Sequence, residues 1–376
     1  MIAQQRLWSG RSLFQLLSVR QQARRGAARA VVAPRMALQP AGDASARAPE
    51  LPDAICVHCG QRFNSAHLAY GVDAKKLSAE ARCRVRAARA RLSALRPQVA
   101  ARVVRLSRDD VAEAFLLRCG GRSTAVRWAQ STAASALRAT LSLTDANGLV
   151  GRGSMHVLST AQAQTLLRAG TAGREKRGVL LDIGAGDGSV TAQLAPLFDA
   201  VVATEVSAPM IRRLRARDFQ AVLHTADVSS GVPEATLAAG VQLPLAADGA
   251  PRFDCVALLN VLDRCDTPRT LLAQLRDLVL PDDGRLLLAV VLPFRPFVED
   301  GPERREPAEL LQLPPDGSFE ESLDLLWREV LQPLGFRLEA ASRVPYMSDG
   351  DTRCPVYVLD DALIVLSVPS ANGDAA

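Results

Sequence analysis

The sequence predicts an α/β fold in which a mostly parallel β-sheet carries helices on both faces. From Gly178 onward, short apolar runs alternate with helical segments, a pattern typical of strands that are buried on both sides. A glycine-rich turn follows the first of these runs, and an acidic residue ends the second. The chain has 376 residues, of which 48% are hydrophobic, so it can bury such a core beside a leader and an accessory region.

Seven apolar runs supply the strands of this sheet. Five are expected to be parallel, each followed by a helix or a loop, at residues 178–183, 199–204, 219–224, 253–259 and 285–292. After a helix that begins near residue 319, two more strands are expected at 336–342 and 356–368, with Pro345 and Gly350 marking the turn. Five parallel strands and a terminal hairpin form the seven-stranded, Rossmann-like sheet of class I methyltransferases.

Capping and turn residues support these boundaries. Ser207 is a suitable N-cap with Pro209 just inside the helix, and Thr267 precedes Pro268 at a first helical position. Residues 229–251 are rich in Ser, Gly, Pro and Ala and only weakly periodic, so we expect a loop insertion before the fourth strand.

Charge divides the chain into regions. Residues 1–50 carry a net charge of +6 and residues 71–140 one of +10, whereas residues 141–376 carry −11. An acidic sheet domain suits a cationic ligand and neutral or basic peptides better than a nucleic-acid backbone. The expected regions are a basic leader and linker at 1–52, an accessory basic helical region at 53–144, the sheet domain at 145–369 and a disordered tail at 370–376.

Composition indicates what the first two regions do. Residues 1–35 interleave short apolar stretches with Arg, Gln and Ser and contain no acid, which is typical of a mitochondrial transit peptide; a cytoplasmic or endomembrane protein with a merely disordered basic tail is the alternative. Residues 72–140 favour two or three helices, and their few aromatic residues favour a solvated basic face over a nucleic-acid surface. No segment reaches the roughly 18 apolar residues that a membrane span needs.

Seven cysteines are scattered along the chain, and an odd number does not suggest a disulfide framework. Cys56-Val-His-Cys59 resembles half of a zinc site, with His58, His67 and Cys83 as conceivable further ligands. A closed site needs four ligands and no second C-x-x-C exists. A pair of ordinary thiols is the simpler interpretation, and no metal is expected.

The run Asp182-Ile-Gly-Ala-Gly-Asp-Gly188, with Glu205 ending the second strand, predicts a site for an adenosine-bearing cofactor. Gly184, Gly186 and Gly188 let the backbone approach a ligand, and an acid about twenty residues downstream can accept ribose hydroxyls. The third glycine comes one residue too early for a dinucleotide fingerprint, and Asp187 puts a negative charge where a diphosphate would lie. Both observations favour S-adenosylmethionine, which is cationic and has no phosphate. A glycine turn without a ligand is the alternative.

Asn260 and Asp263 follow the fourth strand and are the candidate catalytic residues. The carboxyl end of that strand lies beside the cofactor crevice in sheets of this kind. With an imidazole substrate, the Asp263 carboxylate can accept the N–H of one ring nitrogen, which leaves the lone pair of the other free to attack, and can then stabilise the cationic ring. The alternative is that Asp263 or Asp266 caps the next helix, a role that suits Asp266 better.

Six segments also carry a family resemblance: Asn147-Gly-Leu-Val-Gly-Arg-Gly-Ser-Met155, Leu181-Asp-Ile-Gly-Ala-Gly-Asp-Gly188, Ala203-Thr-Glu-Val-Ser207, Leu259-Asn-Val-Leu-Asp-Arg-Cys-Asp266, Val291-Leu-Pro-Phe294 and Tyr357-Val-Leu-Asp-Asp361. Together they resemble the DREV family of methyltransferase-like enzymes, which methylate the pros nitrogen of protein histidines. The resemblance runs from about 145 to 368. It implies S-adenosylmethionine as donor, His-x-His peptides with a small central residue as substrates, and Glu205, Asn260 and Tyr346 as cofactor contacts.

The chain departs from that family in places. The family usually has His where this chain has Arg295, and residues 1–140 show little recognisable similarity. We therefore expect a protein-histidine methyltransferase and retain two alternatives, a small-molecule or RNA methyltransferase and a non-catalytic module that keeps the fold. The intact set Gly184, Gly186, Asp187 and Glu205 argues against the last, because a mere relic of the fold has no need of all four.

Overall fold

The computed structural model describes residues 91–168, 177–225, 228, 231–352 and 354–370. It also describes two short antiparallel strands, β1 (Ala54–Ile55) and β2 (Arg62–Phe63). The expected leader and linker at 1–52, the Cys56 and Cys59 thiols and residues 371–376 of the expected tail lie outside the described residues.

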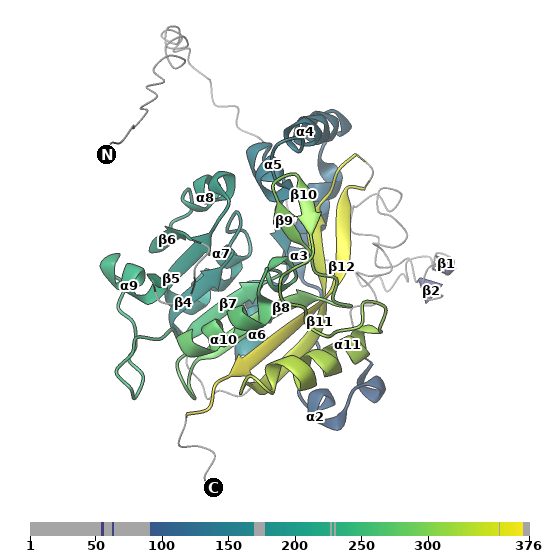
Figure 1. Ribbon diagram of the computed structural model, residues 1–376. Helices are drawn as coiled ribbons and strands as arrows, with labels where there is room; N and C mark the ends of the chain where they lie inside the picture. Colours follow the sequence, from purple (N-terminus) through teal and green to yellow (C-terminus); the bar gives the residue numbers. More distant parts are fainter. Residues whose placement is uncertain are drawn as a thin grey trace, which may run out of the picture. The chain divides into compact units, whose positions relative to one another are not determined.

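One eight-stranded sheet organises the domain, in the order β3-β11-β12-β8-β7-β4-β5-β6 (Figure 1). Its strands are β3 (Met155–His156), β4 (Arg177–Ile183), β5 (Phe198–Glu205), β6 (Ala221–His224), β7 (Cys255–Leu259), β8 (Arg285–Val291), β11 (Arg337–Asp349) and β12 (Val356–Ser367). The strands β4 to β8 are parallel, and β12 and β11 follow as an antiparallel hairpin. The predicted arrangement is confirmed, and β3 adds an unpredicted edge strand next to β11. However, β11 continues past the predicted end at 342 to Asp349, so Pro345 lies inside the strand and does not mark the turn.

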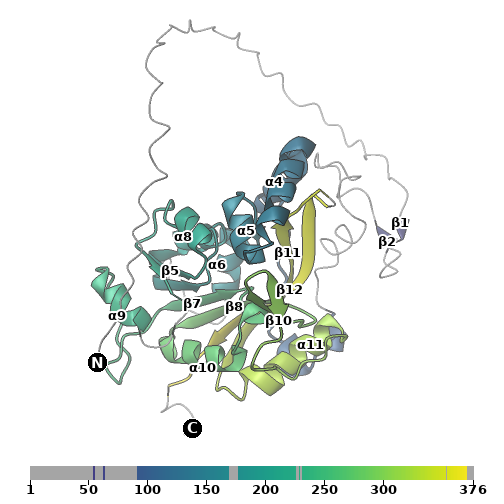
Figure 2. The same cartoon turned by 45° about the horizontal axis from the view of Figure 1, so that its top comes forward.

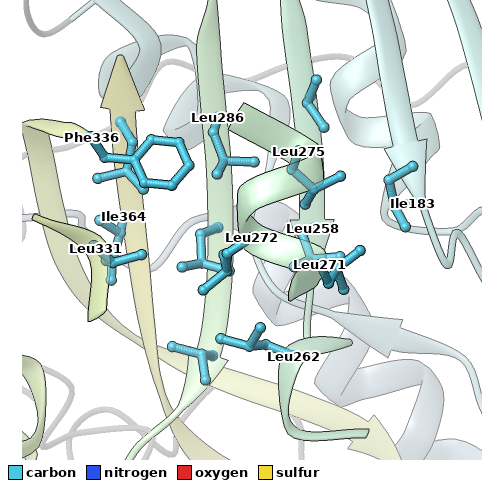
Figure 3. Packing of buried hydrophobic residues seen from close by; sticks show 14 of the residues in the cluster. Ile183, Leu258, Leu262, Leu271, Leu272, Leu275, Leu286, Leu331, Phe336 and Ile364 are labelled. Atoms are coloured by element: carbon cyan, nitrogen blue, oxygen red, sulfur yellow. The ribbon is translucent and has the colours of Figure 1, made fainter. Parts of the chain in front are cut away.

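Helices cover both faces of this sheet. On one face, Ile183, Leu258 and Leu286 pack in one cluster with Leu272 and Leu275 of α10 (Pro268–Leu278) (Figure 3). The helix α11 (Phe319–Leu325) and the π-helix η6 (Leu326–Leu331) lie on the same side (Figure 2). On the other face, the alternate strand residues pack against α6 (Thr160–Arg168), α7 (Thr191–Leu194) and η4 (Ala195–Leu197). The central strands β7 and β8 are almost entirely apolar because each is buried on both faces.

The segment that we expected to be a loop insertion contains a helix, α9 (Gly231–Ala238), so that prediction is wrong for these residues. A parallel connection from β6 to β7 requires a crossover, which a helix usually supplies. Val232 and Thr236 are buried on α9, and the Thr236 hydroxyl donates to the Val232 carbonyl at 2.7 Å. Pro233, near the helix start, is the signal that could have predicted it.

The helices that precede the sheet are part of the same packed unit. They are η3 (Leu92–Ala94), α2 (Pro97–Ala100), α3 (Asp110–Gly121), α4 (Thr124–Leu137) and α5 (Leu143–Leu149). Phe115 and Leu116 of α3 are buried against Met347 of β11 and Val358 of β12. The prediction that this region is helical is confirmed for its described residues. The predicted domain boundary at 144–145, in contrast, divides helices from the strands on which they pack.

Two predicted caps have different outcomes. Ser207 does cap α8 (Ala208–Leu214), since its hydroxyl accepts from the Met210 amide at 3.4 Å. Thr267 is the N-cap residue of α10 but makes no side-chain capping bond, and Asp266, the alternative that we weighed, does not cap the helix either. Its carboxylate instead accepts from the Ala308 amide at 2.8 Å, and the first amides of α10 donate to Glu309, which lies about 40 residues further along the chain.

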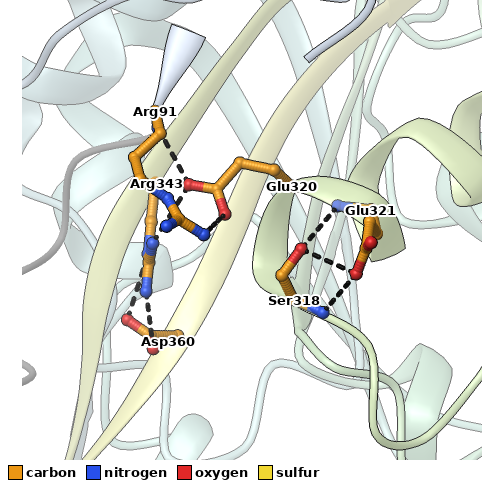
Figure 4. Close-up of polar contacts among 6 residues, drawn as sticks. All are labelled: Arg91, Ser318, Glu320, Glu321, Arg343 and Asp360. Carbon is orange, nitrogen blue, oxygen red and sulfur yellow. Dashed lines mark hydrogen bonds and ion pairs between the residues drawn. The ribbon is translucent and has the colours of Figure 1, made fainter. Parts of the chain in front are cut away.

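A buried ion-pair network joins the N-terminal segment to α11 and the terminal hairpin (Figure 4). Glu320 is fully buried, accepts from the Arg91 amide at 2.8 Å and pairs with Arg343 at 3.3 Å. Arg343 also pairs with Asp360 at 2.9 Å. The network therefore fixes the part of β12 that precedes Asp361.

Candidate active site

The glycine turn after β4 has the backbone conformation that its sequence predicts. Gly184, Gly186 and Gly188 have φ angles of +68°, +59° and +73°, in the left-handed region that favours glycine. A Cβ on Gly184 would lie 2.6 Å from Val261, and one on Gly188 would lie 2.6 Å from Arg217. At Gly186 the nearest atom would be the Met155 methyl at 3.8 Å, so this glycine has space beside it.

Glu205 ends β5 and faces this turn. Its Oε2 accepts from the Gly186 amide at 2.8 Å, and its Oε1 accepts from the Val206 and Ser207 amides at 2.8 and 2.7 Å. A carboxylate offers about four acceptor positions, so these three bonds orient Glu205 and leave capacity for a ligand hydroxyl. This arrangement fits the ribose of an adenosine.

Asp187 is paired with an arginine of α8. Its Oδ2 accepts from the Ser154 hydroxyl at 3.0 Å and pairs with Arg213 at 2.7 Å. Its Oδ1 accepts from the Ser189 amide at 2.9 Å. The charge that we expected to face the cofactor is therefore balanced by Arg213, and Asp187 fixes the turn against the segment that leads into β3.

Asp182 lies beneath the turn and is 2% exposed. Its Oδ2 accepts from the Thr191 hydroxyl at 2.6 Å. Burial raises the pKa of Asp182 to about 7, the Thr191 bond opposes this shift, and the Glu205 charge adds to it. In this position Asp182 ties the start of α7 to the strand that carries the glycines.

Asn260 follows β7 with a φ of +58°, a conformation that Asn adopts more readily than most residues. Its side-chain Nδ2 donates to both carboxylate oxygens of Asp361 at 3.0 Å. Its Oδ1 is buried without a hydrogen-bond partner in the described part of the chain. Because buried polar atoms normally have partners, this oxygen points to a ligand.

Asp263 lies on η5 (Leu262–Arg264) and is 5% exposed. Its Oδ2 pairs with Arg264 at 2.5 Å, whereas its Oδ1 is buried and, within the described ranges, has no hydrogen-bond partner. Burial raises the pKa of Asp263, and the Arg264 charge opposes the shift. The two predicted catalytic residues thus each present one buried, unpaired acceptor.

Tyr346 on β11 connects the two halves of the site. Its hydroxyl donates to the sulfur of Met155, the same residue whose methyl lies nearest Gly186. Burial raises the pKa of Tyr346, and the charges of Asp263 and Asp361 raise it further. We call Asn260, Asp263, Tyr346 and Asp361 the acceptor cluster.

Asp361 was not among the predicted site residues. It is fully buried, and burial raises its pKa well above the usual range, against the Asn260 hydrogen bond and with the Asp263 charge. The signal in the sequence is a pair of acids, Asp360 and Asp361, inside an otherwise apolar strand. A buried carboxyl beside a second one is a common feature of functional sites.

The structure brings the predicted site residues together at the carboxyl ends of the parallel strands, where the glycine turn contacts the Asn260–Asp263 loop. The glycine turn and Glu205 follow β4 and β5, the Asn260–Asp263 loop follows β7, and Val261 packs on Gly184. The carboxyl ends of the strands are where open α/β sheets bind ligands. Arg295 stands apart, because its side chain is 70% exposed and bonds to Pro315 and Asp316.

Among the described residues, no group of three or more His, Cys, Asp or Glu side chains is placed to hold a metal ion. None of the helices described is both long and apolar enough to cross a membrane.

Comparison with known proteins gives one family. A family model described as DREV methyltransferase matches residues 90–239 and 240–368. The match begins well before residue 145, so the expectation of little similarity before residue 140 is wrong from residue 90 onward. The packing of α3 on β11 and β12 gives a physical reason, since these helices complete the core of the sheet domain.

Solved structures of methyltransferases are also similar to this chain. One is magnesium protoporphyrin IX methyltransferase from Synechocystis PCC 6803 with bound S-adenosylmethionine, at 18% identity and a TM-score of 0.32, covering 55% of this chain and 77% of that one. Another is the glycopeptide N-methyltransferase MtfA complexed with S-adenosylmethionine, at 18% identity and a TM-score of 0.33, covering 56% of this chain and 88% of that one.

Proposed function

The chain belongs to the DREV methyltransferase family, and we propose that within it the protein methylates the pros nitrogen of histidine in His-x-His-type motifs of other proteins. S-adenosylmethionine is its methyl donor. When bound, this donor supplies a methyl group on a cationic sulfur that is already activated toward attack. What remains for the chain is to bind the donor, orient a nucleophile and move one proton.

The residues after β4 and β5 fit the donor. Glu205 keeps acceptor capacity for a ribose hydroxyl, and the glycine turn leaves space at Gly186. Asn260 adds a buried acceptor beside the turn. Acceptors and a net-acidic domain suit a ligand that carries two positive charges and no phosphate.

The observation that carries the histidine proposal is the unpaired Oδ1 of Asp263. An acceptor in this place requires a substrate that brings a donor, and a neutral imidazole brings one N–H together with one lone pair. If the N–H of the tele nitrogen is donated to Asp263, the tautomer is fixed and the pros nitrogen is free to attack.

Charge and proton balance follow from the same contact. As the N–C bond forms and the C–S bond breaks, the ring becomes an imidazolium, which the nearby carboxylate stabilises. Burial raises the pKa of Asp263, so this carboxylate is well suited to take the tele proton and return methylhistidine in its neutral form.

The test uses the full chain, isotope-labelled S-adenosylmethionine and two peptides that differ only in having His-Ala-His or Ala-Ala-Ala at their centre. We expect label on the first peptide alone, and hydrolysis followed by chromatography should yield the pros isomer of methylhistidine. The tele isomer would contradict the proposed choice of ring nitrogen, and label on added RNA instead of peptide would favour the RNA alternative. Failure to bind the donor would favour a non-catalytic module.

A further inference from the structure

The side chain of Arg264 is held in a cation–π stack on Phe297. Its guanidinium carbon lies 3.8 Å from the centroid of the Phe297 ring, and the guanidinium carbon of Arg304 lies 4.0 Å from the same centroid. Two cations on one aromatic ring repel each other, so the contact to each needs support from elsewhere. For Arg264 that support is Asp263, to which it is ion-paired.

Phe297 also contacts Asp263 through its backbone. The Phe297 amide donates to the Asp263 carbonyl at 3.0 Å, and Arg264 donates to the same carbonyl at 2.9 Å. Ring, guanidinium and carboxylate therefore form one continuous chain of contacts. The Arg264 side chain is 38% exposed, so without the ring solvent competes with Asp263 for the guanidinium and weakens the ion pair.

The hairpin that follows Phe297 holds the stack in place. It consists of β9 (Val298–Asp300) and β10 (Glu303–Arg305), which pair antiparallel. On one side Glu299 accepts from the Thr144 amide at 3.0 Å and so ties the hairpin to α5. On the other, Arg305 pairs with Asp266 at 2.6 Å, just beyond η5.

We infer that Phe297 is a positioning residue: by holding the Arg264 guanidinium on one oxygen of Asp263, it leaves the other oxygen free for the substrate. This inference rests on the role proposed for Asp263. Phe297 itself is given no contact with substrate, donor or reacting atoms. Its aromatic face matters because an aliphatic side chain of similar bulk cannot bind a guanidinium through a π system.

The arrangement has a consequence for pH. The charged and titratable groups that face Asp263 are Arg264 on η5, Tyr346 on β11 and Asp361 on β12. Arg264 alone among them lowers the pKa of Asp263. Weakening the ion pair with Arg264 reduces the largest influence that lowers the pKa of Asp263, so less Asp263 is ionised at a given pH and, on acidification, activity is lost at a higher pH.

The test compares Phe297→Leu with Phe297→Tyr, which keeps the aromatic face. For Phe297→Leu we expect kcat to fall about tenfold to a hundredfold, as for other misplaced catalytic groups, with donor affinity unchanged. The acid limb of the kcat/KM profile should move up by about one pH unit. Phe297→Tyr should restore both.

Phe115→Leu is the matched control, because Phe115 on α3 stacks with Arg118 at 5.0 Å and packs with Met347 and Val358 instead of with Arg264 or Asp263. It should leave the pH profile in place. The inference is overturned if the acid limb does not move in a folded Phe297→Leu protein, or if Phe297→Tyr is as impaired as Phe297→Leu.

A measurement without substrate separates this inference from the proposed function. Carboxyl ¹³C resonances of the full chain, with Asp263 assigned by its loss in Asp263→Asn, report the pKa of Asp263 directly. A higher pKa in Phe297→Leu supports the positioning role even if the wild-type protein fails to methylate the histidine peptide. An equal pKa in both proteins contradicts it even if the peptide is methylated.

Discussion

Asn260 and Asp263 each bury one side-chain oxygen that lacks a partner in the part of the chain that the structure describes. Leaving a buried polar group unpaired costs about 1–3 kcal/mol, so two such atoms three residues apart are expensive for the protein alone. The orientation of the Asn260 amide is set by Asp361, because Nδ2 donates to both of its carboxyl oxygens at 3.0 Å. At the scale of single residues, then, the cost is recovered when a ligand brings hydrogen-bond donors.

The first residue-scale prediction concerns Asp263→Asn. The amide loses the charge that stabilises an imidazolium and cannot take a proton, so we expect turnover of the His-Ala-His peptide to fall by about a hundredfold to a thousandfold or more. Calorimetric titration should show donor affinity within about threefold of wild type. Asp277→Asn, at an exposed acid of α10, is the control and should keep full activity. Normal turnover by Asp263→Asn would refute the assignment.

The second concerns the stability contributed by Asp182. Burial raises its pKa to about 7 from the usual 3.8, with the Thr191 bond in opposition. Between these pH values the unfolded chain loses the proton while the folded chain keeps it, so this contribution is complete below about pH 4 and declines as pH rises toward 7. As pH rises from 4 to 8, the melting temperature of the wild type should fall relative to that of Asp182→Asn. A difference in melting temperature that does not change with pH would contradict the prediction.

At the scale of elements, strands could be predicted from the local sequence pattern, whereas contacts between segments far apart in the sequence could not. The strands were predictable because parallel strands bury both faces and read as unbroken apolar runs. The helix α9 was missed because its residues are weakly periodic, although its place is dictated by the crossover from β6 to β7. Glu309 accepts from the first amides of α10, but no local pattern predicts this role, because its sequence separation from Thr270 is 39.

The candidate site divides in the same way. The positive φ angles of the glycine turn could be predicted because glycine favours them, at Gly184, Gly186 and Gly188. The position of Glu205 at the site could be predicted from its distance along the sequence from this turn. The role of Asp361 could not be predicted, because its sequence separation from Asn260 is 101 and the two come together only through the pairing of β12 with β8. The pairing of Asp187 with Arg213 also needed the structure, since charge patterning shows only that both are present.

Contacts between segments far apart in the sequence hold the described part of the chain together, and the network around Glu320 is one of them. It joins Arg91, α11, β11 and β12, and the sequence separation of Arg91 and Glu320 is 229. Burial disfavours the charge on Glu320, but the bonds from Arg91 and the charge of Arg343 outweigh it and lower its pKa. An acid in this state stabilises the fold above its usual pKa of 4.5 and loses that contribution as pH falls through the folded value.

Glu320→Gln tests this network at the level of global unfolding. Removing one partner leaves Arg343, whose side chain is 14% exposed, with only Asp360 as a counter-charge. We expect a loss of about 3 kcal/mol in the free energy of unfolding at pH 7, the lower end for a broken buried pair, because Arg91 is largely exposed. Urea melts should show the loss shrinking as pH falls below about 4.5, where the unfolded chain takes up the proton, and disappearing once pH passes below the lowered pKa of the folded protein. Glu329→Gln removes an exposed pair with Arg328 and should cost less than about 0.5 kcal/mol. Equal losses in both variants would mean that the network contributes no more than a surface ion pair.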